Sequence, residues 1–181
     1  MNYQELYESI LRDLEQDIRP QIKLSKNDLY ELALYWNDLL LNWHKERESD
    51  LKKILCIVDH SQTLSRELAQ PIIKTLYLDI PSDLIIYSIA SAQKHIITKS
   101  ALEGVPVPPD FVEVLKKLLD SKDPEVFEWV LRAIESMGNQ SLKFRDVVLK
   151  KKPSFFATFN KHMKAAKGII QILEKRWEVF K

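Results

Sequence analysis

The chain has 181 residues, of which 45% are hydrophobic and 29% are charged, a composition typical of a globular domain with one continuous core. Its three glycines exclude a glycine-rich phosphate-binding loop, and its single Cys56 excludes an internal disulfide. The acidic residues 1–17 lack the pattern of a secretion signal, so a cytoplasmic location is expected. The longest uncharged apolar stretch, residues 84–92, is too short for a membrane span.

Apolar residues recur at helical spacing through the first hundred residues. One amphipathic helix is predicted from Tyr3 to Ile18, because Arg19-Pro20 would stop it. A second helix is predicted to begin after Ser25, which forms a variant of the capping box with Asp28. Further helices are predicted over residues 51–59 with Ser49 as the cap, over residues 63–77 with a kink or restart at Pro71, and over residues 82–102.

The clearest pattern is a helical hairpin. Its first helix is predicted from Phe111 to Leu119, with Asp110 as the N-cap. Its second helix follows a cap at Asp123, has Pro124 at the first helical position, and ends at Gly138 in the left-handed conformation. The apolar stripe of this second helix is wide enough to require neighbours on two sides: Val126, Phe127, Val130, Leu131, Ala133, Ile134 and Met137.

A second copy of this pattern lies 42 residues earlier, where Pro71–Tyr77 falls on Glu113–Leu119 and Tyr87 falls on Trp129. This period is typical of two-helix repeats, and residues 69–138 resemble the HEAT and armadillo repeat families. The resemblance implies an all-α fold, in which antiparallel hairpins stack as a short solenoid and bind other macromolecules without chemistry of their own. A single domain over residues 1–181 is expected. Phe127 departs from the family, which often has Arg there.

The C-terminal region, residues 141–181, is basic: it holds 11 Lys or Arg and 3 Asp or Glu, a net charge of +8, whereas residues 1–60 carry −4 and residues 61–140 carry −3. A short helix is predicted from Ser141 to Lys150, and a long one from Pro153-Ser154 onward. The long helix has a coiled-coil-like apolar seam, made of Phe156, Phe159, Met163, Ala166, Ile170, Leu173, Trp177 and Phe180. We expect it to cap the last hairpin of a monomer; the alternative is a dimer formed through the helix 154–180.

Residues that carry chemistry are sparse. His44 and Glu48 are four apart, but in a charged run they more often describe a solvated helix end than a metal site. His60, His95 and His162 have no metal-ligand spacing, and Cys56 lies in an apolar run that favours a buried, inert thiol. The sequence therefore predicts no catalytic residue, no metal and no cofactor, and a protein that is not an enzyme.

Aromatic residues at helix edges are the candidate binding residues. The resemblance places Tyr87, Trp129 and Arg132 on the concave face of a solenoid, with Lys94 near Tyr87, and these residue types are enriched at binding hot spots. They predict a protein partner for an adaptor, scaffold or inhibitor; the alternative is that both rings complete the core. A second hypothesis is a nucleic-acid-binding HEAT-like protein, DNA glycosylases included, in which Lys150, Lys151 and Lys152 contact phosphates.

Overall fold

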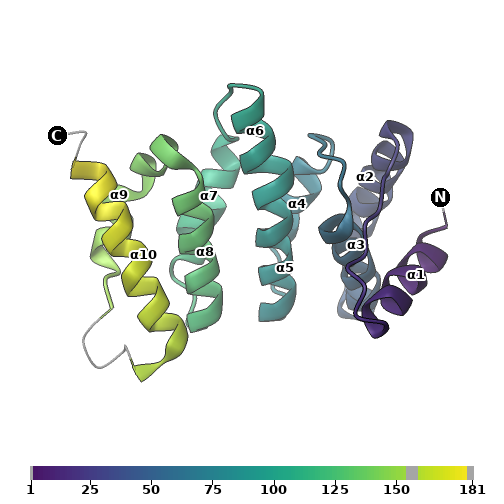
Figure 1. Ribbon diagram of the computed structural model, residues 1–181, viewed down its shortest axis with the longest axis horizontal. Helices are drawn as coiled ribbons and strands as arrows, with labels where there is room; N and C mark the ends of the chain where they lie inside the picture. The colour runs from purple at the N-terminus through teal and green to yellow at the C-terminus, as the bar shows by residue number, and fades with distance from the viewer. Residues whose placement is uncertain (1, 154–158, 179–181) are drawn as a thin grey trace. The chain divides into compact units, whose positions relative to one another are not determined.

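The structure is all-helical, as the sequence predicts. The computed structural model describes residues 2–153 and 159–178 (Figure 1). The only β-type pairing among these residues is an isolated parallel bridge between Ile22 and Ser61. Residue contacts group into two compact units, residues 1–99 and residues 100–181. The stacking of hairpins into one HEAT-like solenoid domain stays a prediction, so each unit is described by itself.

The first unit is built around α3. Its elements are α1 (Tyr3–Glu15), α2 (Lys26–Leu41), a short 3₁₀ helix (Lys45–Arg47), α3 (Glu48–His60), α4 (Ala69–Leu76), α5 (Ser82–Ala92) and the π-helical turn η2 (Gln93–Thr98). Helix α3 packs against α1, α2 and α5, and α4 packs against α2 and α5 (Figure 1). The short α6 (Lys99–Leu102) begins at the last residue of the first unit, and its other residues belong to the second unit.

Some of these helix ends lie where the local sequence predicts them, and others do not. The capping box is confirmed, because Asp28 accepts from the Ser25 amide at 2.9 Å and donates its own amide to Ser25 Oγ at 3.1 Å. The helix predicted over residues 63–77 begins only at Ala69, so the kink is wrong and the alternative, a start near Pro71, is closer to the structure. Pro71 lies in the first turn of α4, where a missing amide costs no helical hydrogen bond. The start of α3 also differs, since it begins at Glu48 without a side-chain cap.

Trp36 lies at the centre of the first unit. It is fully buried, and its indole Nε1 donates to Thr75 Oγ1 at 3.0 Å. The Thr75 hydroxyl in turn donates to the Pro71 carbonyl oxygen at 2.8 Å. This chain of two hydrogen bonds ties α2 to α4 inside the apolar core.

The second unit is built around α8. Its elements are α7 (Pro109–Leu118), α8 (Pro124–Ser136), the 3₁₀ helix η3 (Gly138–Phe144), α9 (Arg145–Lys150) and α10 (Lys161–Glu178). Helix α8 packs against α7 and α10, and α9 also contacts α10 (Figure 1). The cap at Asp123 and the left-handed Gly138, with φ of 60°, are confirmed. The cap at Asp110 is wrong, because α7 begins at Pro109 and places Asp110 in its first turn.

The C-terminal helix begins later than the sequence predicts. Helix α10 starts at Lys161, where Asn160 Oδ1 accepts from the amides of His162 and Met163 at 2.8 and 3.2 Å. Phe159 therefore precedes the helix and is 86% exposed rather than part of the seam. Phe156 and Phe180 lie outside the described residues.

The remainder of the predicted seam is largely confirmed. Ala166, Ile170, Leu173 and Trp177 are buried, and α10 packs along α8 and α9. The Trp177 indole donates to Ser141 Oγ at 3.0 Å, so the far end of α10 is fixed to η3. Within the second unit, the seam thus covers the hairpin helix α8.

Candidate functional site

The polar side of α8, which includes the predicted binding residue Arg132, is partly covered by α10. Glu128 is only 7% exposed and its carboxylate accepts from Arg132 Nε at 2.8 Å. The same carboxylate contacts His162 Nδ1 of α10 at 2.8 Å, and His162 Nε2 lies 3.7 Å from Glu125. Further along, Arg176 donates to the Glu135 carbonyl oxygen at 2.6 Å. The acidic residues of α8 thus bind a helix of the same chain.

The predicted anchor residues have different surroundings. On α8, Trp129 is half-buried and Arg132 is exposed, although its guanidinium is held by Glu128. Tyr87 on α5 is 42% exposed. Tyr87 belongs to the first unit, whereas Trp129 and Arg132 belong to the second, so a joint surface of the three stays a prediction. Lys94 pairs with Asp59 of α3.

The basic tract is partly neutralised by nearby carboxylates. Lys151 forms an ion pair with Asp120, and Lys152 Nζ lies 2.8 and 2.9 Å from the two oxygens of Glu174. Lys150, at the end of α9, is exposed. Two of the three lysines therefore bind acidic groups of the second unit, which lowers the charge available to a phosphate backbone.

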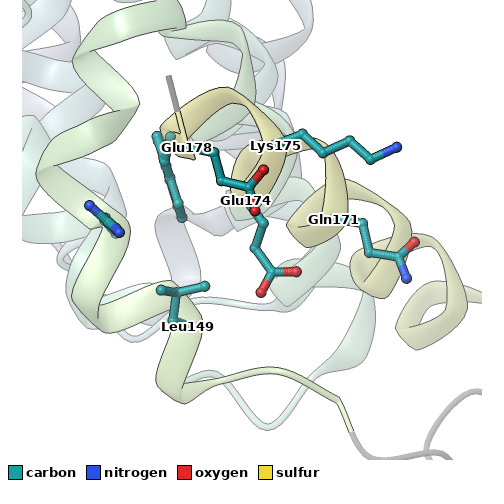
Figure 2. Close-up of a pocket in the computed structure, with 7 residues that line it drawn as sticks. Leu149, Gln171, Glu174, Lys175 and Glu178 are labelled. Carbon is teal, nitrogen blue, oxygen red and sulfur yellow. The ribbon is translucent and has the colours of Figure 1, made fainter. Parts of the chain in front are cut away.

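A cavity of about 510 Å³ lies between α9 and α10. Figure 2 shows Leu149 on α9 and, across from it, Gln171, Glu174, Lys175 and Glu178 on α10. Glu174 and Glu178 bring negative charge to this cavity, and Glu174 already binds Lys152. Such a mixture of carboxylates and cations does not make a groove for nucleic acid.

The outer face of α2 is a surface that sequence reasoning missed. Tyr30, Leu34 and Leu41 are 54%, 52% and 80% exposed. At 100° per residue these three positions fall within about 40° of one another, and they extend roughly 16 Å along the helix. We call these three residues the α2 outer face. The opposite side of α2 is buried in the core through Leu29, Leu32, Trp36 and Leu39.

The rim of the α2 outer face is polar and acidic on one side. Asp38 is exposed beside the stripe, and Glu31 accepts from Asn27 Nδ2 at 2.8 Å. Within the stripe, Asn37 accepts from Lys74 Nζ of α4 at 2.9 Å. The sequence contains a signal for this surface. Helix α2 is apolar on nearly every side, which is typical of a helix that is covered on all sides, so an uncovered side exposes apolar residues.

Three further features of the described residues concern metal ions, the single cysteine and membrane spans. They hold no cluster of three or more His, Cys, Asp or Glu that would bind a metal ion. Burial, followed by the negative charge of Asp59, raises the pKa of the Cys56 thiol and so disfavours the reactive thiolate. Within the same residues, no helix has both the length and the apolar character needed to cross a membrane.

Comparison of the chain with protein-family models, with curated proteins and with solved structures finds no match. The HEAT and armadillo resemblance of residues 69–138 therefore stays a prediction.

Proposed function

We propose that this protein is a non-enzymatic interaction module, an adaptor, scaffold or inhibitor, and that a protein partner docks on the α2 outer face. One observation carries the proposal: three large apolar side chains, Tyr30, Leu34 and Leu41, are each more than half exposed on one side of a single helix. Isolated apolar residues on a surface need no explanation, but several large ones aligned on one side of a helix, with a polar rim, favour an interface.

The rim indicates the chemistry of the partner. Asp38 and Glu31 border the stripe, and residues 1–60 carry a net charge of −4. A partner that presents apolar side chains flanked by Lys or Arg would bury the stripe and pair with these carboxylates. Tyr30 supplies an aromatic side chain of the kind that is enriched at interface hot spots, and its hydroxyl is able to stay in contact with water at the edge of the interface.

The test uses the full chain as bait in extracts of cells that naturally express it, and compares wild type with the double variant Leu34→Gln/Leu41→Gln. Glutamine keeps helix propensity and removes the apolar side chain. A partner that uses this surface should be depleted by the variant. Titration of the purified partner should then show a loss of affinity of at least about tenfold, since a hot-spot truncation costs more than about 1 to 2 kcal/mol.

The matched control is Leu102→Gln, which changes a leucine that is 72% exposed on α6. A second variant, Tyr87→Ala, tests the surface predicted from the sequence. Retention of every partner by the double variant would reject the α2 outer face, and a loss confined to Tyr87→Ala would move the interface to α5. All variants should unfold within about 0.5 kcal/mol of wild type, as exposed substitutions do.

A further inference from the structure

A second cavity, of about 610 Å³, lies in the first unit. Its lining comes from the segment after α1, the end of α3 with the loop that follows, and the π-helical turn η2. The polar lining residues are Arg19, Gln21, Asp59, His60, Ser61, Gln62 and Lys94. This size is within the range of small-molecule sites, and it is separate from the α2 outer face.

Hydrogen bonds fix the walls of this cavity to each other. The Ile22 amide donates to the His60 carbonyl oxygen at 3.1 Å, and the Gln62 amide donates to the Ile22 carbonyl oxygen at 2.8 Å. Gln62 Nε2 also donates to Gln21 Oε1 at 2.8 Å. On the third wall, Lys94 donates to the carbonyl oxygen of Asp59. The segments that carry the polar groups are therefore held in place before any ligand arrives.

The π-helical turn η2 carries Lys94, and within this turn Thr98 Oγ1 donates to the Gln93 carbonyl oxygen at 2.8 Å. His95, which follows Lys94, is buried and accepts from the Ser65 amide at 3.2 Å, which anchors the turn to the loop after α3. Single π turns within helices occur frequently at functional sites.

The cavity carries an excess of positive charge and of hydrogen-bond donors. Arg19 and Lys94 outweigh Asp59, whose carboxylate lies 4.0 Å from Lys94 Nζ. The pKa of His60 is lowered, first by burial and then by the positive charges of Lys94 and Arg19, against the opposing effect of Asp59. Arg19, Lys94 and His60 therefore line the same cavity.

We propose that this cavity binds the phosphoryl group of a small phosphomonoester, or free phosphate, with Arg19 as the principal contact. The Arg19 guanidinium is exposed and suits two oxygens at once, while Lys94 supplies a point charge and His60 with the glutamine amides supplies further donors. A phosphate ion alone fills only part of 610 Å³, so an ester with an organic group is expected to bind more tightly than the free ion.

The test is an NMR titration of the whole chain in a phosphate-free buffer, with orthophosphate and O-phosphoserine as probes. Serine, which lacks the phosphoryl group, is the matched ligand control. Binding should move the His60 imidazole signals and raise the pKa of His60, because a dianion beside it favours the protonated ring. Phosphoserine should bind more tightly than orthophosphate, and serine should cause no shift.

The variant Arg19→Gln removes the principal contact at an exposed position and should weaken phosphoserine binding at least about tenfold. Lys45→Gln, which changes an exposed lysine of the same unit outside the cavity, should leave the affinity unchanged. The proposal is overturned if millimolar phosphoserine leaves His60 unmoved, if serine produces the same shifts, or if Arg19→Gln binds as tightly as wild type.

Discussion

The two units differ in how far a central helix is covered by its neighbours. In the second unit, α8 is packed by α7 on one side and by α10 on the other, and its carboxylates bind His162 and Arg176. In the first unit, α2 is packed by α3 and α4, while its outer face stays exposed. A surface that the chain covers itself is a poor docking site, whereas one that it leaves apolar and exposed is a good one.

The units also differ in the polar groups that they bury. In the second unit, the buried Glu128 binds the cationic Arg132 and contacts His162. In the first unit, the buried His95 has no partner for Nε2 among the described residues. The second unit thus buries a carboxylate that binds Arg132, whereas the first unit buries an imidazole whose Nε2 has no partner among the described residues.

The largest expected effect concerns the seam of α10. The variant Ile170→Asp places a charge at a fully buried position and should lower the free energy of unfolding by about 4 kcal/mol. The matched control is Ile172→Asp, two residues away and 52% exposed, which should change it by less than about 0.5 kcal/mol. Urea unfolding with light scattering checks both. A wild-type dimer that Ile170→Asp turns into a folded monomer would show that the seam joins two copies instead.

The next effect is a dependence of stability on pH in the first unit. Burial lowers the pKa of His95 from 6.5 to about 4, with the Lys94 charge acting in the same direction and Asp59 and the bonded backbone opposing it. Between these two pH values His95 is protonated in the unfolded chain but not in the folded one. The contribution of His95 to the free energy of unfolding is therefore fully present above pH 6.5 and is lost as the pH falls towards about 4. The loss should be on the order of 2 kcal/mol by pH 5.

This pH effect is measured by urea unfolding of wild type and of His95→Gln across that range. The variant lacks the titrating group, so its stability should fall less steeply as the solution becomes acidic. Parallel curves for the two proteins would mean that His95 is protonated as easily in the folded chain as in the unfolded one.

A smaller effect should come from the junction of α8 and α10. Glu128→Gln keeps the size of the side chain but removes the charge that binds Arg132 and contacts His162, at an expected cost of about 1.5 kcal/mol. Glu125→Gln is the matched control, since Glu125 is half exposed and lies 3.7 Å from His162; a change below about 0.5 kcal/mol is expected. If both variants lost the same free energy of unfolding, the buried carboxylate of Glu128 would contribute no more to stability than the half-exposed one of Glu125.

The smallest expected effect is the binding of nucleic acid to Lys150, Lys151 and Lys152. Since Lys151 and Lys152 already bind Asp120 and Glu174, duplex or single strands should bind weakly, without sequence preference, and with a shallow dependence on salt. Fluorescence anisotropy at two salt concentrations measures this, with the triple variant Lys150→Gln/Lys151→Gln/Lys152→Gln as comparison. Tight, sequence-selective binding at the higher salt would favour the nucleic-acid hypothesis over the protein partner.

Signals confined to a few neighbouring residues predicted the structure well. Ser25 with Asp28, Asp123 with Pro124, and Gly138 each set a helix end through contacts within four residues or through one backbone angle. Helical periodicity also gave the all-α class and most of the α10 seam. The start of α10 was missed because Asn160, which caps it, lies inside an apolar pattern that continues on both sides.

The candidate surfaces were harder to predict, because they depend on contacts between distant residues. Nothing local to Glu128 shows that His162 will bind it. The α2 outer face was missed for a related reason: Tyr30 and Leu34 look like core residues until the number of helices packed around α2 is known. The cavity of Arg19 and Lys94 joins segments that are far apart in the sequence.

The two buried tryptophans give each unit its own optical reporter. Trp36 and Trp177 are both shielded from water, and each indole donates to a hydroxyl, of Thr75 and of Ser141. When the surrounding helices separate, the emission of each indole should move to longer wavelengths. Phenylalanine at Trp43 and Trp129 would leave one tryptophan per unit. Tryptophan emission would then distinguish a single unfolding transition from two successive ones.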